Sequence, residues 1–190
     1  MEPFVTTFDA SGHRHFSPVD SSAQERAARL RQLGLGDSAD ADFDAFAQRI
    51  AQTLGVPNAM VNFITDTHQY LGGLFTRVPS MEDANAETDP RSAPMETGYC
   101  PHVIARRMAL VLEDVCDYPR FAGNDVVDKM NVRSYLGAPL IDRTGLALGT
   151  VCVVDTEPRP WGRDGLNAIK SLAGEGVELL HRREREIQGS

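Results

Sequence analysis

Apolar residues recur at helical spacing in three separate stretches of the chain. The first helix is predicted to begin at Ser22, which can form a capping box with Glu25, and to end at Gly34. A second helix is predicted over 41–54, directly before Gly55. Its apolar residues lie three or four positions apart: Phe43, Phe46, Ala47, Ile50, Ala51 and Leu54. The first part of the chain is therefore predicted to be a pair of amphipathic helices.

The third helical stretch is long and covers residues 163–187 near the end of the chain. Its apolar residues follow a roughly heptad spacing: Leu166, Ile169, Ala173, Leu180 and Ile187. Gly176 and Arg183 interrupt this stripe. Stripes of this kind on the first and last helices fit a helical dimer interface, but they also fit helices that merely cover a sheet.

Between these helices the composition becomes typical of β-strands. Two hairpins are predicted, one from strands 58–64 and 69–75, and one from strands 134–141 and 146–155. Pro139 has no N–H group to donate to a neighbouring strand. We therefore expect its strand to be bulged at this point, or exposed on that side.

The segment between the two hairpins is predicted to be irregular. It begins with a loop over 76–98, which contains three prolines and almost no apolar residues. A short helix from about 100, a strand over 109–115 and a short helical segment near 123–131 follow. Structureless connections longer than about 15 residues are uncommon in compact domains. The loop is therefore interpreted either as a lid over a site or as a surface insertion.

The length of 190 residues suits one domain with additional terminal segments. Residues 1–20 carry no convincing periodicity and are predicted to be an N-terminal arm. Residues 21–40 are predicted to form a lead-in helix and linker, and residues 41–187 the main domain.

Composition and charge narrow the possible partners and location. The net charge of −8 argues against nucleic-acid binding, which requires clustered Lys and Arg. No apolar run approaches the about 20 residues that span a bilayer, so no membrane partner is expected. The N-terminus lacks the pattern of a secretory signal, and three cysteines form no disulfide framework. A cytoplasmic protein is expected.

The string YCPHV, residues 99–103, is the main candidate for chemistry. Cys100 and His102 could serve as two metal ligands, but no second close pair completes a tetrahedral set. A Cys-Pro dipeptide alone is too short to indicate haem, so neither metal nor haem is favoured and any cofactor is unknown. A redox disulfide between Cys100 and Cys116 remains open. The sequence contains no phosphate-binding loop, no nucleophile elbow and no His-Glu-x-x-His motif.

Three longer stretches resemble the GAF domain family. They are FDAFAQRIAQTLGVPNAMVNFITDTHQYLGGL, GYCPHVIARRMALVLEDVCDYPRFAGND and RSYLGAPLIDRTGLALGTVCVVDTEPRPW, and together they cover about 41–185. The resemblance implies an α+β fold with a central antiparallel sheet. The N- and C-terminal helices would lie on one face, and a small-molecule pocket on the other. It also implies that Cys100 and Cys152 are small packing residues.

GAF domains bind many unrelated ligands, so the family alone does not fix the function. The patterns of bilin-binding and cyclic-nucleotide-binding relatives are not found here. One enzyme of this fold, free methionine-R-sulfoxide reductase, uses cysteines, and Cys100 fits one of them. Asn124 stands where the likeness would place another, and Cys116 falls several residues too early.

The sequence therefore predicts a single-GAF sensory or regulatory protein that is not an enzyme. An unidentified small molecule would bind between the sheet and segment 99–131, and a homodimer or a partner protein would carry the signal. By the resemblance, the ligand-binding residues are Tyr99, Cys100, His102, Phe121, Asn124, Asp128, Met130 and Tyr135. The alternatives are the reductase and a ligand-free scaffold, in which Phe121 and Met130 would fill the pocket.

Overall fold

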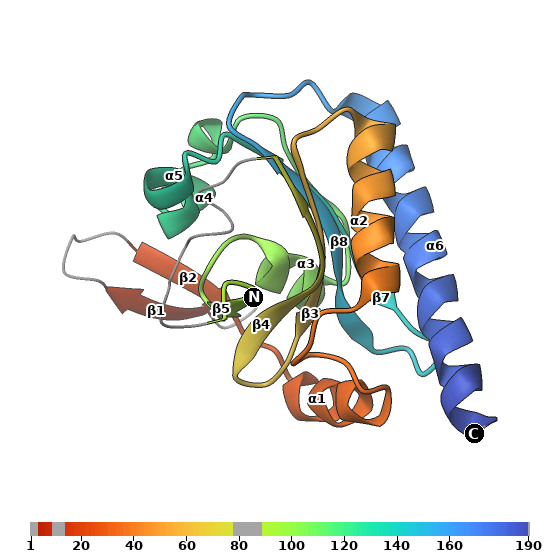
Figure 1. Cartoon of the computed structure of the whole chain (residues 1–190). Helices are drawn as coiled ribbons and strands as arrows, with labels where there is room; N and C mark the ends of the chain where they lie inside the picture. The colour runs from red at the N-terminus through yellow and green to blue at the C-terminus, as the bar shows by residue number, and fades with distance from the viewer. Residues whose placement is uncertain (1–3, 9–13, 78–88, 190) are drawn as a thin grey trace.

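The computed structural model describes residues 4–8, 14–77 and 89–189. Its centre is a six-stranded antiparallel sheet with the order β5-β4-β3-β8-β7-β6 (Figure 1). The strands are β3 (Asn58–Ile64), β4 (His68–Thr76), β5 (Ser92–Pro94), β6 (Leu110–Leu112), β7 (Ser134–Ile141) and β8 (Ala147–Asp155). The two predicted hairpins are β3–β4 and β7–β8, and β3 and β8 pair at the centre of the sheet. The predicted α+β class is confirmed.

Pro139 lies in β7 at a place where the outer strand has already ended. The partner β6 pairs only with Tyr135–Gly137, so position 139 extends beyond it. The β7–β8 register also shifts between Leu140 and Ile141. Both features agree with the expectation of an exposed or bulged strand, because a proline leaves one backbone position unable to donate.

Two helices cover one face of this sheet. Helix α2 (Ala41–Leu54) packs on β3 and β4, and α6 (Gly162–Gln188) packs on β7 and β8 (Figure 1). The Asp40 side chain begins α2 by accepting hydrogen bonds from the backbone N–H groups of Asp42 and Phe43. Gly55 ends it with a positive φ of 63°.

The apolar residues between these helices and the sheet form what we call the helical-face core. It also includes residues from the segment before α2, among them Leu30 and Leu33. Its other large members include Phe43, Phe46, Ile50, Phe63, Leu136, Leu140, Leu148, Ile169, Leu172 and Leu180.

Most apolar residues of the stripe on α6 are buried in the helical-face core. Ile169, Ala173 and Leu180 are buried within the chain, whereas Ile187 remains exposed. Gly176 is buried in the same stripe, where α6 lies close to side chains of α2 and β7. A Cβ at this position would lie 2.8 Å from Leu140 Cδ2 and 3.1 Å from Phe46 Cε1. The glycine that interrupts the heptad pattern is thus required by close packing.

Helix α1 (Ala23–Gln32) begins where the sequence predicts, but the predicted capping box is wrong. Ser22 is the N-cap residue, and its side chain makes no capping hydrogen bond. The anchor is instead Arg26, which is 1% exposed. Its Nε donates to the carbonyl of Ile64 over 2.6 Å, and its guanidinium pairs with Asp20. A buried arginine thus ties α1 to the end of β3.

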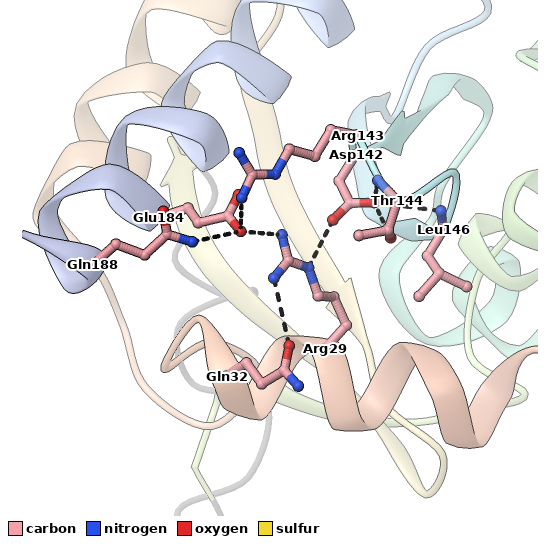
Figure 2. Close-up of polar contacts among 8 residues, drawn as sticks. All are labelled: Arg29, Gln32, Asp142, Arg143, Thr144, Leu146, Glu184 and Gln188. Atoms are coloured by element: carbon pink, nitrogen blue, oxygen red, sulfur yellow. Dashed lines mark hydrogen bonds and ion pairs between the residues drawn. The ribbon is translucent and has the colours of Figure 1, made fainter.

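A network of ion pairs holds α1, the β7–β8 turn and the C-terminal part of α6 together (Figure 2). Arg29 Nε lies 2.8 Å from Asp142 Oδ2, and Arg29 Nη2 lies 2.8 Å from Glu184 Oε1. Arg143 pairs with the same Glu184 oxygen over 2.5 Å. Burial acts to raise the pKa of both carboxyl groups. Hydrogen bonds, from Thr144 and Arg29 to Asp142 and from Arg29 and Arg143 to Glu184, outweigh it and hold both pKa values below the ordinary range.

The helical segments on the opposite face of the sheet are short. They are α3 (Cys100–Arg106), η2 (Val115–Asp117), α4 (Pro119–Ala122) and α5 (Asp125–Met130). The predicted strand 109–115 is shorter than expected, because Asp114 already caps η2 by accepting from the backbone N–H of Cys116. The helical segment predicted near 123–131 begins at Asp125 and is preceded by a separate turn of helix, α4.

Two segments predicted to lack regular structure contain strands. Within the loop 76–98, Ser92–Pro94 form β5 and pair with β4, and residues 78–88 lie outside the described residues. In the N-terminal arm, β1 (Phe4–Phe8) and β2 (Arg14–Pro18) form an antiparallel hairpin. This hairpin lies against α3, on the face opposite α2 and α6 (Figure 1). The sequence did not indicate β1 and β2, because two five-residue segments without apolar periodicity give no sign that they pair.

Candidate functional site

The predicted site residues lie on the face of the sheet that carries α3, α4 and α5. The apolar residues there form what we call the site-face core, which includes Met60, Ile64, Tyr99, Cys100, Val103, Phe121, Val126, Tyr135, Cys152 and Val154. Six of the eight predicted residues are buried: Tyr99, Cys100, His102, Phe121, Asn124 and Tyr135. Met130 is partly buried against this core. Asp128 is exposed, so the structure does not bring it together with the others.

Four of the buried residues form an aromatic cluster. The ring of Tyr99 makes edge-to-face contacts with Phe121, at 5.6 Å between centroids, and with Tyr135, at 5.2 Å. The ring of His102 contacts Phe121 from another side, at 5.1 Å. Tyr99 also donates a hydrogen bond to the backbone carbonyl of Phe121 over 3.3 Å. The side chain of Phe121 thus fills the space between α3 and α4.

His102 is a buried imidazole with one nitrogen that has no partner. Its side chain is 8% exposed, and Nδ1 has no hydrogen-bond partner among the described residues. Burial lowers the pKa of His102 to about 4, and the positive charges of Arg120 and Arg106 act in the same direction. The imidazole is therefore neutral at pH 7 and offers an unused polar atom inside the fold.

Two thiols meet at the start of α3. Cys100 Sγ lies 3.5 Å from Cys152 Sγ and 3.4 Å from the hydroxyl of Tyr135. Gly137 makes room for this arrangement, because a Cβ there would lie 2.2 Å from the Tyr135 hydroxyl oxygen. Cys116, the partner considered from the sequence, is exposed and lies in η2. The thiol that contacts Cys100 in the structure is therefore Cys152.

The two thiols differ in their tendency to ionise. Hydrogen bonding by Cys152 lowers the pKa of the Cys100 thiol to about 6, against the opposing effect of burial, and Tyr135 contributes in the same direction as Cys152. The same contact with Cys100 raises the pKa of Cys152, and burial adds to this. Burial also raises the pKa of Tyr135, so its phenol remains a hydrogen-bond donor.

Asn124 acts as a clamp inside the protein. Its Oδ1 accepts from the backbone N–H of Gly98 over 3.0 Å, and its Nδ2 donates to the Gly98 carbonyl over 2.9 Å. The same Oδ1 caps α5 by accepting from the N–H of Val126. Because the backbone already occupies these groups, Asn124 fixes the strand-to-helix connection before α3.

Two buried amides in the strands are site residues that the sequence analysis missed. Asn62 in β3 is 3% exposed, and its Nδ2 donates to Gln69 Oε1 in β4 over 2.9 Å. Gln69 Nε2 in turn donates to the carbonyls of Pro94 and Thr97. Asn62 Oδ1 and the hydroxyl Oγ1 of its neighbour Thr150 have no partner among the described residues.

Strand alternation places Asn62 and Thr150 on the site face. Met60 and Ile64 belong to the site-face core, and Asn62 lies between them with period two. In β8, Thr150 lies two positions before Cys152, which also belongs to this core, so the two side chains point to the same face. A polar residue at an inward position of a predicted strand is the sequence signal that could have found both.

A model of the GAF domain family matches residues 38–175. The chain belongs to the GAF domain family. The fold described above, with the helical face on one side and α3 to α5 on the other, is the fold that the family resemblance implies.

Three relatives show how widely this GAF fold is used. The chain is 28% identical over 144 residues to a cyclic di-GMP phosphodiesterase of Pseudomonas aeruginosa, which covers 75% of this chain and 23% of the phosphodiesterase. The GAF domain of an Acinetobacter phosphoenolpyruvate-protein phosphotransferase is 15% identical, with a TM-score of 0.58 over 86% of this chain and 96% of that one. A free methionine-R-sulfoxide reductase of Neisseria meningitidis is 16% identical, with a TM-score of 0.57 over 96% and 98%.

These relatives support the fold, but the chemistry of this GAF domain has to be argued from its own residues. The chain spans about a quarter of the length of the phosphodiesterase. The structural likenesses are below 20% identity, so they show the shared fold alone.

The described residues of this GAF domain contain no group of three or more His, Cys, Asp or Glu side chains that could hold a metal ion. No helix in that part of the chain is long and apolar enough to cross a membrane.

An open groove lies elsewhere on this GAF domain and includes none of the predicted site residues. It has a volume of about 430 Å³ and runs between α6, β7 and the α3–β6 connection. Its walls are mainly apolar, and they include Met108, Pro139, Leu166 and Val177, with Arg107 and Lys170 as the charged members.

Proposed function

We propose that this chain is a non-enzymatic sensory GAF domain that binds a small molecule on the face formed by α3, α4 and α5. One observation carries the proposal. Three buried polar atoms on this face have no partner among the described residues: His102 Nδ1, Asn62 Oδ1 and Thr150 Oγ1. A buried polar group without a partner costs about 1–3 kcal/mol. A ligand or ordered water that supplies the missing hydrogen bonds would remove that cost.

The surroundings of these atoms support a small, partly aromatic ligand. Tyr99, Tyr135 and Phe121 provide aromatic surfaces, and the polar atoms are few, which is the usual make-up of a small-molecule site. Phe121 fills this space in the structure, and it is carried by the four-residue helix α4. Ligand binding would therefore require α4 to move outward, so α4 is the element we expect to respond to the ligand.

The output of this sensor is proposed to pass through helices to a second molecule or module. The Pseudomonas aeruginosa phosphodiesterase matches this chain over only 23% of its own length. That likeness supports a regulatory role beside an enzyme of cyclic di-GMP turnover. The exposed side chain of Ile187 near the end of α6 offers a point for helix-mediated dimerisation. Size-exclusion chromatography with light scattering would show a strict monomer at every concentration if the dimer proposal is wrong.

The deciding experiment compares the native and denatured masses of freshly purified protein, together with its absorbance spectrum. The proposal predicts a bound mass that is lost on denaturation, or thermal stabilisation by at least one member of a metabolite set. Tyr118→Ala removes an exposed ring from the same segment and should leave binding unchanged. Phe121→Ala should change the affinity. Three results together would contradict ligand sensing: a native mass equal to that of the chain alone, no visible absorbance band, and no metabolite that raises the thermal stability of the protein.

The same experiment separates the two alternatives. If the domain is a ligand-free scaffold, the wild-type protein should show no bound mass. Only Phe121→Ala should then gain affinity for small apolar compounds. A sulfoxide reductase would turn over free methionine sulfoxide, and Cys100→Ser would abolish that activity. We do not favour the reductase, because Asn124 stands where the likeness would place a cysteine and its amide is held by the backbone of Gly98.

A further inference from the structure

We propose that Cys100 and Cys152 form a reversible disulfide when the protein meets a hydroperoxide, so that the start of α3 is a redox-modified site. The proposal does not depend on ligand binding. It rests on the contact between two free thiols that come from different elements of the fold, the first residue of α3 and the middle of β8.

The geometry places the two sulfur atoms in van der Waals contact. They are 3.5 Å apart, and a disulfide requires about 2.05 Å. Helix α3, which carries Cys100, packs directly on β8, which carries Cys152, so the two thiols already face each other across this contact. Cys116 cannot replace either thiol in this contact, because it is exposed in η2.

The surroundings assign different roles to the two thiols. Cys100 receives hydrogen bonding from Cys152 and from the Tyr135 hydroxyl, which stabilises its thiolate. These contacts lower the pKa of the Cys100 thiol and make it the nucleophile of the pair. Cys152 keeps its proton and is the thiol that resolves the first product. The side chains of Thr150 and Asn62 lie on the same face and also act to lower the pKa of the Cys100 thiol.

The chemistry balances in two steps. The Cys100 thiolate attacks one oxygen of the hydroperoxide, an S–O bond forms, the O–O bond breaks, and the leaving oxygen takes up a proton to become water or an alcohol. The sulfur of Cys152 then attacks the sulfenic acid at Cys100. An S–S bond forms, the S–O bond breaks, and the proton of Cys152 leaves with the hydroxyl group as water. The two sulfurs are oxidised, the peroxide is reduced, and an external dithiol reverses the change.

The test uses the full chain with Cys116→Ser, which removes the exposed thiol and leaves the core unchanged. The protein is treated with hydrogen peroxide, denatured without reductant and alkylated. We expect no alkylation, a mass lower by two hydrogen atoms, and a cross-linked pair of peptides containing residues 100 and 152. Dithiothreitol should restore two alkylated sites.

Two double variants assign the roles. In Cys116→Ser/Cys152→Ser, Cys100 should be trapped as a sulfenic acid by dimedone, because no resolving thiol remains. In Cys116→Ser/Cys100→Ser, Cys152 should stay reduced under the same treatment. Circular dichroism before treatment confirms that each variant is folded.

Two results would overturn the proposal. In the first, both thiols of Cys116→Ser remain fully alkylatable after a peroxide exposure that oxidises a free cysteine peptide. In the second, the thiols gain oxygen atoms without forming a cross-link. Neither result would bear on the native-mass experiment, so the redox site and the ligand site fail or succeed separately.

Discussion

The two faces of the central sheet are built from the same strands but differ in chemistry. Beneath α2 and α6, long helices press aliphatic and phenyl side chains onto the sheet. Beneath α3, α4 and α5, short segments enclose two thiols, a neutral imidazole, two amides and a hydroxyl among aromatic rings. Buried polar atoms without a partner among the described residues occur on both faces, Trp161 Nε1 in the helical-face core being one of them. The site face differs because its polar groups lie beside two thiols and an aromatic cluster.

The largest expected effect comes from emptying the helical-face core. Phe46→Ala should lower the free energy of unfolding by about 4 kcal/mol, since Phe46 is 2% exposed and a cavity would remain between α2 and α6. Urea unfolding followed by circular dichroism measures this. Phe121→Ala is the matched change on the site face and should cost clearly less, because α4 can collapse onto the space. Equal costs would mean that the two faces do not differ in rigidity.

A somewhat smaller loss is expected from the ion-pair network at the end of α6. Arg29→Met keeps the length of the side chain but leaves Asp142 and Glu184 buried without their shared partner. The free energy of unfolding should fall by about 3 kcal/mol. Arg49→Met removes an exposed pair with Glu175 and serves as control, with an expected cost of about 0.5 kcal/mol or less. Similar losses in the two variants would show that the network is merely a surface feature.

The third prediction concerns pH and the site face. His102 titrates at about 4 in the folded protein and near 6.5 when unfolded, so the unfolded chain binds the proton first as the pH falls. The stabilising contribution is present above the unfolded pKa and is lost as the pH falls below it. Between about pH 7 and about pH 5 this group alone should remove about 2 kcal/mol of stability.

His102→Phe should remove that part of the pH dependence. Stability curves of the two proteins, measured in urea at several pH values, give the difference without the contribution of the shared carboxylates. Parallel curves would contradict a buried neutral imidazole.

The smallest effect is expected at Thr150. Thr150→Val removes a hydroxyl that has no partner among the described residues and keeps the shape of the side chain. The free energy of unfolding should rise by about 1 kcal/mol. A ligand or ordered water bound to this hydroxyl would reverse the sign, so urea unfolding of this variant shows whether the site is dry. Thr53→Val on the exposed surface of α2 controls for the general effect of valine.

Much of the fold could be predicted because its long elements carry a clear period. Helix α2 matches its predicted bounds, and both hairpins lie where β-rich composition placed them. The failures were set by contacts distant in sequence. Arg26 anchors α1 through the carbonyl of Ile64, and β5 exists because β4 offers it a partner.

The candidate site shows the same limit. The string around Cys100 pointed to the right helix, and six predicted residues are indeed buried together. The sequence left a disulfide between Cys100 and Cys116 open, whereas the structure places the thiol of Cys152 against Cys100. Only the pairing of β8 with β3 and β7, which places β8 beneath α3, brings Cys152 within reach. Asn124 was expected to touch a ligand, yet its amide is occupied by the backbone.

The two outermost strands, β5 and β6, are only three residues long. Open strand edges invite pairing with other chains, and short ones give a foreign strand little backbone to join. Pro139, beyond the reach of β6, has no N–H group to offer such a strand. Growth of the sheet by addition of outside strands is therefore discouraged at β5 and β6 themselves. A domain of this kind can be crowded beside copies of itself, or joined to other domains, with little risk of aggregating through its sheet.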